Sequence, residues 1–345
     1  MEFASQLGYT YRSLKEVRMR AVVCTRYGPP EVLKIEQVEK PVPKDNEILI
    51  KVLATTVTSA DSRVRGFRVP ISFWLPARIA LGFTRPKRAI LGSELSGEIE
   101  SVGKDVKKFK NNDRVIGYLG HDLFGANAEY VCMAENGGLA IKPPNLTFEQ
   151  AAAIPFGGIT ALYFLKKAGV HNGQKVLIYG ASGSVGTYAV QLAKYFGAEV
   201  TGVTSAANDA LVKSIGADAV IDYTKEDFTK NGVTYDVILD AVGKTNVSRC
   251  LTALKEEGTY VNIVAAPATM LKMRWASLRT KKKLIGGTAV PSAENLIFLT
   301  DLAGLGKITP VIDRVYPLEQ IVDAHRYVDQ GLKRGIVVIA TVCCK

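Results

Sequence analysis

The segment KVLIYGASGSVGTYAVQLAKYFGAEVTGV, residues 175–203, decides the fold of this chain. It opens with a short apolar run of the kind found in strands that are buried on both faces. Three evenly spaced glycines follow, Gly180, Gly183 and Gly186, and they lead into a helical pattern of apolar residues. A second apolar strand over 199–203 closes the unit. A strand–helix–strand unit of about thirty residues with glycines at its first turn is typical of dinucleotide-binding proteins.

The glycine spacing has a physical reason. The first glycine permits the tight turn, the second lets a pyrophosphate approach the backbone, and the third allows helix and strand to pack closely. The N-terminus of the following helix offers free N–H groups and the positive end of its dipole to the phosphates. The first gap is GxxG rather than GxG, so a glycine-rich turn in another α/β protein is the alternative. The predicted cofactor-binding residues of this turn are Gly180, Ser182, Gly183, Ser184, Val185 and Gly186.

Strands and helices alternate along the rest of this region, which predicts a doubly wound parallel sheet. The further strands are expected over 219–222, 236–242, 258–264 and 283–290, and the helices over 207–215, 246–254 and 293–305. Before residue 145, short strands punctuated by Gly and Pro predict a β-barrel-like unit instead. A helix over 160–167 is expected at the junction. The C-terminal residues add a strand, a helix and a terminal strand, consistent with a return to the first domain.

Composition places the chain among globular proteins of reducing compartments. Its 345 residues suffice for two domains, and no apolar run has the length of a membrane span. The five cysteines lack CxxC spacing, so we expect reduced thiols and a cytoplasmic location. Part of the formal charge of +11 is interpreted as complementing a phosphate-rich cofactor and the rest as a solvated basic surface, and no aromatic-plus-basic motif predicts a nucleic-acid partner. Residues 1–18 precede the first strand as an N-terminal extension.

Several stretches together resemble the medium-chain dehydrogenase/reductase family, in its zinc-independent, quinone oxidoreductase-like branch. They include LGSELSGEIESVG (91–103), YGASGSVGTYAVQLAKYFGAEVTGVTS (179–205), LVKSIGADAVIDYTKEDF (211–228) and RGIVVIAT (334–341). The resemblance covers nearly everything from Met19 onward. It implies a GroES-like β-barrel domain built from residues 19–145 and 308–345, with a Rossmann domain over 146–307 inserted between them. It also implies a homodimer joined through the last Rossmann strand.

The resemblance also locates where zinc-dependent relatives hold their catalytic metal. The matching positions are Thr58, in the stretch TSAD, Ser93, and the glycines at 157–158. Zinc takes thiolate, imidazole or carboxylate ligands, so we expect no zinc site here. Without a metal to lower the pKa of an alcohol, reduction of a quinone or an α,β-unsaturated carbonyl is the favoured chemistry.

Thr58 is the candidate hydrogen-bond donor near the nicotinamide, because the resemblance places it where the zinc-free branch often has Asn. A buried strand threonine without a catalytic role is the alternative. Asp61 is expected to position this loop rather than act as an acid or base. The resemblance places Thr160 near the phosphate on the nicotinamide side. Residues at the ends of two parallel strands, where ligands bind in open α/β sheets, complete the predicted site: Val242, Gly243, Val264 and Ala265.

Cofactor preference depends on the end of the second Rossmann strand. An enzyme specific for NAD usually carries an acid there, which binds the ribose 2′-hydroxyl. Here Thr204, Ser205 and Asn208 offer small polar side chains that leave room for a 2′-phosphate. Tyr223 matches a position that often lies beside this phosphate in the branch. We therefore expect NADPH, with NADH as the alternative. Relatives often have Lys or Asn where this chain has Ile336, so a cofactor contact from that side chain is not expected.

Residues 66–90, GFRVPISFWLPARIALGFTRPKRAI, form an insert of apolar and basic residues. The resemblance places it where family members have a shorter loop, which implies a cover for the substrate cleft, with Phe73 and Trp74 as apolar walls. A packed loop without such a role is the alternative, and contact with a membrane surface is the less favoured one. The chain is thus expected to be an NADPH-dependent, zinc-independent reductase of quinones or enones. The alternatives are a nucleotide-dependent RNA-binding protein resembling zeta-crystallin, with little catalysis, and a zinc-free alcohol dehydrogenase.

Overall fold

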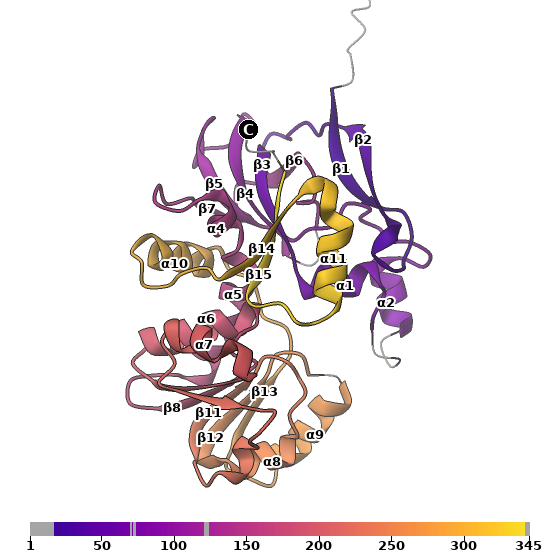
Figure 1. The fold of residues 1–345 in the computed structure, drawn as a ribbon. Helices are drawn as coiled ribbons and strands as arrows, with labels where there is room; N and C mark the ends of the chain where they lie inside the picture. The colour runs from indigo at the N-terminus through magenta and orange to yellow at the C-terminus, as the bar shows by residue number, and fades with distance from the viewer. Residues whose placement is uncertain (1–16, 70, 72–73, 121–123, 266, 342–345) are drawn as a thin grey trace, which may run out of the picture.

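The computed structural model describes residues 17–69, 71, 74–120, 124–265 and 267–341 (Figure 1). The expected N-terminal extension therefore lies almost wholly outside the described residues. Two sheets organise the rest, one built from the middle of the chain and the other from both of its ends. The boundaries 145/146 and 307/308 fall in segments between these sheets and stay a prediction.

The middle of the chain forms a six-stranded sheet in which all strands are parallel. Its order is β10-β9-β8-β11-β12-β13, so the direction of winding changes between β8 and β11. The strands are β8 (Lys175–Tyr179), β9 (Glu199–Thr204), β10 (Ala219–Asp222), β11 (Tyr235–Asp240), β12 (Leu254–Asn262) and β13 (Lys283–Gly286). The connecting helices are α6 (Ser184–Tyr195), α7 (Asp209–Ser214), α8 (Val247–Thr252) and α9 (Pro267–Ser277). In such sheets ligands bind at the carboxyl ends of the strands beside the change of winding.

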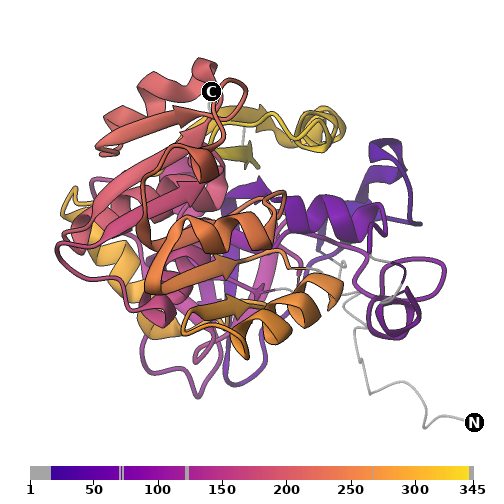
Figure 2. The ribbon, with the colours of Figure 1, turned by 90° about the horizontal axis from the view of Figure 1, so that it is seen from below.

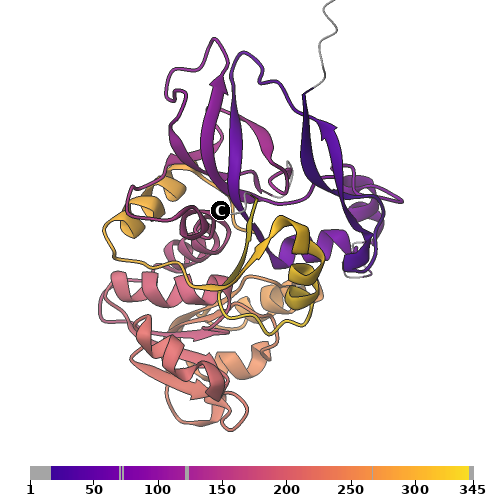
Figure 3. The same ribbon diagram turned by 45° about the horizontal axis from the view of Figure 1, so that its top comes forward.

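The ends of the chain share a seven-stranded sheet. It contains β14 (Ile312–Pro317), β15 (Ile336–Ala340), β3 (Glu47–Val57), β4 (Glu94–Val102), β5 (Arg114–Tyr118) and β7 (Gly138–Ile141) in that order, and β6 (Tyr130–Ala134) pairs with β3. Strand β15 is hydrogen-bonded to β3 in antiparallel orientation. The C-terminal segment therefore completes a sheet begun by the N-terminal half of the chain. In Figure 3 the yellow C-terminal segment reaches the indigo and purple strands of this sheet.

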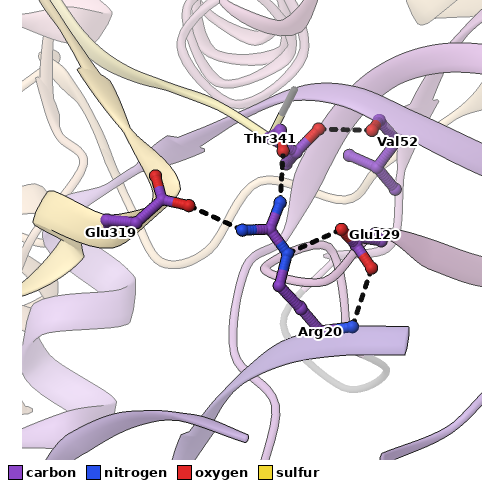
Figure 4. Close-up of polar contacts among 5 residues, drawn as sticks. All are labelled: Arg20, Val52, Glu129, Glu319 and Thr341. Carbon is purple, nitrogen blue, oxygen red and sulfur yellow. Dashed lines mark hydrogen bonds and ion pairs between the residues drawn. The ribbon is translucent and has the colours of Figure 1, made fainter. Parts of the chain in front are cut away.

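A separate hairpin of β1 (Arg18–Cys24) and β2 (Leu33–Glu39) adjoins this sheet through backbone hydrogen bonds of β1 and through the side chain of Arg20. Its guanidinium contacts Glu129 at 2.7 Å and Glu319 at 2.6 Å, and it donates to the Thr341 carbonyl at 3.4 Å (Figure 4). The Thr341 hydroxyl in turn donates to the Val52 carbonyl. One arginine thus ties together the first strand and the last residues that the structure describes.

Helices lie between and around the two sheets. They are α4 (Phe148–Ala152), α5 (Pro155–Ala168) and α10 (Ala293–Gly304) near the junction, and α1 (Ser59–Arg65), α2 (Trp74–Leu81) and α11 (Ile321–Asp329) on the barrel domain. Buried residues of α5 and α6 share one large core with the parallel sheet and with barrel residues such as Ile116 and Val338. The two domains are therefore packed against each other through apolar side chains.

Several expected boundaries were wrong. The junction helix begins at Pro155 rather than residue 160, because proline is accommodated in the first helical turn. The last parallel strand ends at Gly286 instead of residue 290, and Gly287 follows with a φ of 120°. Helices α2 and α9 were not expected at all. Most of their large apolar residues are exposed, and Met273 of α9 is the exception, so neither segment carries the one-sided pattern by which a packed helix is found.

The interior of the barrel domain holds a titratable group that leads to a prediction. His325 on α11 is fully buried, and neither ring nitrogen has a hydrogen-bond partner within the described part of the chain. Burial lowers the pKa of His325 to about 3, and the nearby Arg65 charge acts in the same direction. The folded chain therefore binds fewer protons than the unfolded chain, whose histidine titrates near 6.5.

Stability is expected to fall as pH drops from 6.5 towards 3, since unfolding takes up a proton on this ring. At pH 5 the loss due to His325 should be about 2 kcal/mol. Urea unfolding of the native chain and of His325→Leu at pH 7, 6 and 5 measures it. The variant should lose less stability on acidification; parallel losses in both proteins would place the acid sensitivity elsewhere.

Candidate active site

The glycine-rich turn lies between β8 and α6, at the carboxyl edge of the parallel sheet. Gly180 has a φ of 83°, a left-handed conformation that favours glycine, and its N–H donates to the Val203 carbonyl at 3.0 Å. A Cβ on Gly186 would lie 2.0 Å from the Gly180 carbonyl oxygen, so only glycine lets the helix sit this close. A Cβ on Gly183, at the N-cap of α6, would meet nothing closer than 3.5 Å. Gly183 thus leaves free space in front of the helix N-terminus.

Beside this turn, Ser182 gathers the polar residues expected to set cofactor preference. Its Oγ accepts hydrogen bonds from Thr204 Oγ1 at 2.9 Å and Asn208 Nδ2 at 3.1 Å. Asn208 Nδ2 also lies 3.3 Å from Ser205 Oγ, while its Oδ1 is buried without a hydrogen-bond partner among the described residues. Tyr223 is exposed, and its N–H donates to the Thr204 carbonyl at 3.1 Å. The structure therefore brings these five residues together.

One acid near this cluster was missed. Asp222 ends β10 and is paired in register with Thr204 of β9. Its Oδ1 accepts hydrogen bonds from the Thr224 N–H and hydroxyl, and the hydroxyl bond is the main cause that lowers the pKa of this carboxyl. Although β9 itself ends without an acid, the neighbouring strand therefore places a carboxylate beside Thr204. The sequence alone did not show this, because it does not contain the register between strands.

A second missed residue joins the two domains at the start of α6. Lys333 Nζ donates to Ser184 Oγ and, at 2.8 Å, to the Gly335 carbonyl. The Gly335 N–H donates to the Ser182 carbonyl at 2.8 Å, so the loop before β15 is fixed to the glycine-rich turn. Burial lowers the pKa of Lys333 to about 8. A cation thus lies where the helix N-terminus already favours an anion. Ile336 itself is buried in β15.

Glu94, at the start of β4, is the third residue that sequence reasoning missed. It is buried, it accepts a hydrogen bond from the Thr56 hydroxyl, and it accepts another from the Phe156 N–H at 2.6 Å. Burial raises the pKa of Glu94 to about 8, while the positive charge of Lys333 works against that rise. A carboxylate inside the apolar run LGSEL was the available signal, because charged side chains are rarely buried without a partner.

Thr58 and Asp61 form a capping box at the start of α1. The Thr58 hydroxyl accepts from the Asp61 N–H at 3.2 Å and lies 2.6 Å from Asp61 Oδ2, to which it donates. The carboxylate also accepts from the Thr58 N–H at 2.8 Å and from the Gly92 N–H at 3.1 Å. Asp61 therefore holds the loop of Thr58 against the loop before β4. The Thr58 hydroxyl donates its proton to Asp61, so it is not free to donate to a substrate in this conformation. The expected role of Thr58 as a donor stays a prediction.

Asp61→Asn should lower the free energy of unfolding by about 2–3 kcal/mol. An amide nitrogen at Oδ2 would face two donors, and buried donors left without an acceptor cost about 1–3 kcal/mol. Thr58→Ser keeps the capping hydroxyl and should cost less than 1 kcal/mol. Urea unfolding at neutral pH compares the two variants. An Asn variant as stable as the native chain would show that the carboxylate is not needed to hold this loop.

Val242, Gly243, Val264 and Ala265 lie in the loops that follow β11 and β12, because both strands end two residues earlier than expected. The N–H groups of Val242 and Gly243 donate to Asp240 Oδ1 at 2.9 and 2.7 Å. A Cβ on Gly243 would come within 2.3 Å of a Val264 methyl, so the loops after β11 and β12 are in contact. Ala265 is the next residue after Val264 and belongs to the same loop. Thr160 lies within α5 rather than at its start, and its hydroxyl donates to the Phe156 carbonyl at 2.7 Å.

The expected cover of the substrate cleft is described only in part. Phe73 lies outside the described residues. Trp74 begins α2, is about half exposed, and meets the Phe67 ring edge-on at 6.4 Å between centroids. The Arg78 guanidinium stacks on the Phe67 ring at 3.8 Å. Trp74 thus belongs to an aromatic cluster on the outside of the barrel domain, and its role as a substrate wall stays a prediction.

The positions expected from the resemblance to match zinc ligands are Thr58, Ser93 and the glycines at 157–158. Thr58 Oγ1 is engaged in the capping box, and Ser93 Oγ is buried without a hydrogen-bond partner among the described residues. Hydroxyls of this kind and the two glycines of α5 are not ligands that zinc takes in proteins. Nor does the part of the chain that the structure describes bring three His, Cys, Asp or Glu side chains together elsewhere.

Comparison with known proteins supports both domains. The family model "Alcohol dehydrogenase GroES-like domain" matches residues 44–144, and "Zinc-binding dehydrogenase" matches residues 215–339. The chain is 34% identical to 2-methylene-furan-3-one reductase of Solanum lycopersicum over 93% of its own length and 79% of that protein. It is 32% identical to the chloroplast envelope quinone oxidoreductase homolog of Arabidopsis thaliana, over 93% and 98%.

A solved structure agrees with these relatives. The quinone oxidoreductase of Coxiella burnetii superposes with a TM-score of 0.85 at 31% identity, over 94% of this chain and 100% of the other. The predicted fold class, a GroES-like barrel with a Rossmann domain, is thereby confirmed. The relatives are named as oxidoreductases, which identifies the enzyme class of the site described above.

Proposed function

We propose that this chain, which belongs to the quinone oxidoreductase-like branch of the medium-chain dehydrogenase/reductase family, reduces quinones or α,β-unsaturated carbonyls with NADPH. The observation that carries the proposal is the site at the domain junction. There, the glycine-rich turn at the carboxyl edge of the parallel sheet leaves open space before α6, and Lys333 of the barrel domain lies against Ser184 of that helix. The relatives named as quinone or enone reductases favour the same substrate class.

The residues present fit a dinucleotide. Gly183 leaves space before the N-terminus of α6, where backbone N–H groups can bind the pyrophosphate. Ser184 on α6 and Lys333 from the barrel domain would hold the phosphates. Ser182, Ser205 and Asn208 would hold the 2′-phosphate through hydroxyl and amide groups, which favours NADPH over NADH.

NADPH supplies a hydride to the electrophilic carbon of the substrate. The chain's part is to orient the substrate carbonyl and to stabilise the negative charge that grows on its oxygen. Ser93 is the better donor for this purpose, because its buried hydroxyl has no other partner among the described residues whereas the Thr58 hydroxyl serves Asp61. The adjoining Glu94 is held largely protonated at neutral pH, since burial raises its pKa to about 8. A neutral Glu94 adds no repulsion to an enolate-like oxygen.

Turnover of NADPH with a panel of simple quinones and enones tests the function. The native chain should oxidise NADPH in the presence of such acceptors, and Ser93→Ala should lower kcat about 10- to 100-fold while leaving the Kd for NADPH unchanged. Oxidation of alcohols with NADP⁺ but no reduction of the panel would instead favour a zinc-free alcohol dehydrogenase. Full activity of the Ser93 variant would remove the proposed donor. Stoichiometric zinc in the active protein would contradict the zinc-independent mechanism.

Lys333 should make NADPH binding depend on pH. Burial lowers its pKa to about 8, and a bound pyrophosphate would stabilise the ammonium form and raise that pKa again. Above pH 8, binding must then take up a proton, so affinity should fall by up to about tenfold per pH unit. Fluorescence titration of NADPH at pH 7, 8 and 9 measures this slope. Lys333→Met should bind more weakly and without the slope; an equal slope in both proteins would contradict the assignment.

We further propose a homodimer in the cytoplasm. In the described residues β13 pairs only with β12, which leaves one edge of the parallel sheet open to a second copy. Sedimentation analysis that finds only monomer would contradict the dimer.

Some relatives carry "chloroplastic" or "mitochondrial" in their names, so fractionation of cells decides the compartment. Within the described residues no helix is both long and apolar enough to span a bilayer.

A further inference from the structure

The whole net charge of the chain resides in two short segments. Residues 66–90 contain five Arg and Lys, residues 267–283 contain six, and neither segment contains Asp or Glu. The other 33 basic residues are balanced by the 33 acidic ones. Thirty-three of the 44 basic residues do lie outside these segments, as a dispersed basic surface requires, but the excess of basic over acidic residues does not. Two strongly basic segments stand on an otherwise neutral molecule, and this points to a polyanionic partner.

Both segments also expose large apolar side chains. The first contains α2, in which no residue is buried, and the second contains α9, whose Met273 alone reaches the core. The exposed apolar residues are Ile71, Trp74, Leu75, Ile79 and Phe83 in the first segment and Met270, Leu271, Trp275 and Leu278 in the second. Ile71 is 92% exposed and Leu278 is 80% exposed. Folding of a single chain gives no reason to place such side chains in water together with so many cations.

The two segments lie on the same side of the molecule, although they belong to different domains. Figure 1 shows α2 and α9 along its right-hand side, and Figure 2, seen from below, again places them near each other. Each adjoins the candidate active site along the chain. The first lies between the loops of Thr58 and Ser93, and α9 begins two residues after Ala265. A partner that held both helices would face the site between them.

A pocket of about 740 Å³ opens at the second segment, between α9 and the loop that leads into α8. Lys272, Trp275 and Arg279 line one side, and hydroxyl groups that include those of Thr245 and Ser248 line the other. Within the described part of the chain, Lys281 of this segment is paired with Glu256, whereas Lys272 and Arg274 have no ion pair. Such cations, hydroxyls and an indole match the chemistry of a phosphorylated lipid headgroup at a membrane interface.

We propose that α2 and α9, with the described residues that flank them within 66–90 and 267–283, form a two-part docking surface for an anionic phospholipid bilayer. Cations near such a surface each add to its attraction, and exposed Trp, Leu and Ile side chains enter the boundary between headgroups and acyl chains. A single-stranded nucleic acid would use the cations and the aromatic rings but would leave Ile71, Leu271 and Leu278 in water. The docking does not depend on the proposed reaction. It would present the candidate site to apolar molecules dissolved in the membrane.

Vesicle co-sedimentation of the full chain tests the proposal. The native protein should bind vesicles that contain phosphatidylglycerol, bind those of phosphatidylcholine alone weakly, and be released by salt. Lys272→Gln/Arg274→Gln/Arg279→Gln should bind about 100-fold more weakly. The matched control, Lys107→Gln/Lys108→Gln/Lys110→Gln, removes three exposed cations from the barrel domain and should bind like the native chain. Leu271→Ser/Leu278→Ser keeps every charge and should also weaken binding.

Two further arms keep the test decisive. Ile79→Ser/Phe83→Ser examines the first segment, and thermal unfolding of each variant shows that the fold is retained. Absence of native binding to anionic vesicles would overturn the proposal. Equal loss in the α9 variant and its matched control would show attraction by net charge without a defined surface. Tighter binding to single-stranded RNA than to vesicles would also overturn it, because the surface would then be a nucleic-acid site.

Discussion

Gly183→Ala is expected to weaken NADPH binding about 10- to 100-fold while leaving the cofactor-free chain as stable as before. The position is the N-cap of α6, with a φ of −82° and a ψ of 175° that any residue can adopt. A methyl group there would meet only the Gly180 carbonyl oxygen, at an ordinary contact distance of 3.5 Å. The fold therefore does not require glycine. In the proposed complex the pyrophosphate fills the space before the helix, and a methyl group would displace it from the N–H groups.

Gly186→Ala provides the matched contrast. Its methyl group would lie 2.0 Å from the Gly180 carbonyl oxygen and 2.9 Å from the Ala181 backbone. Helix α6 would have to move away from the turn, at a cost of about 3 kcal/mol to the cofactor-free chain. Urea unfolding without cofactor and fluorescence titration with NADPH separate the two effects. If Gly183→Ala binds NADPH as tightly as the native chain, the pyrophosphate does not lie at this turn.

At this site the sequence predicts the residues that are close together along the chain, but not the contacts between distant segments. The turn, its helix and the polar residues after β9 follow each other within about thirty residues, so local spacing predicts them. Lys333 and Ser184 are 149 positions apart, and nothing local indicates that they meet. The pairing of Asp222 with Thr204 depends on strand register, which a single sequence does not contain. Glu94 was detectable in principle, because a carboxylate interrupts an apolar strand.

The fold divides in the same way. Strands and helices that bury one face were found, with boundaries shifted by a few residues. Helices α2 and α9 were missed because most of their large apolar side chains are exposed, with Met273 as the exception, so no period of core-facing residues marks them. The same arrangement is the basis of the proposed membrane surface. Helices α2 and α9 depart from the usual burial of apolar side chains without a structural reason, and such departures are expected at functional surfaces.

Ser205→Glu is expected to reverse cofactor preference, lowering kcat/KM with NADPH about 100-fold while that with NADH stays level or rises. Ser205 follows the last residue of β9, and its hydroxyl lies 3.3 Å from Asn208 Nδ2, beside the proposed 2′-phosphate site. A glutamate there places like charges together, whereas the same carboxylate can accept from the free 2′-hydroxyl of NADH. Ser205→Gln, of equal size and without charge, is the control and should keep the preference for NADPH.

Asp222 makes this experiment sharper, because the native site already contains one carboxylate next to Thr204. Its Oδ1 accepts from the Thr224 N–H and hydroxyl, so this carboxylate is partly engaged in its own loop. Asp222→Asn should therefore raise kcat/KM with NADPH by no more than about tenfold, and change that with NADH little. Steady-state kinetics with both cofactors and one quinone measures all three variants. Parallel losses with NADPH and NADH in Ser205→Glu would mean that the side chain disturbs β9, and that the 2′-phosphate lies elsewhere.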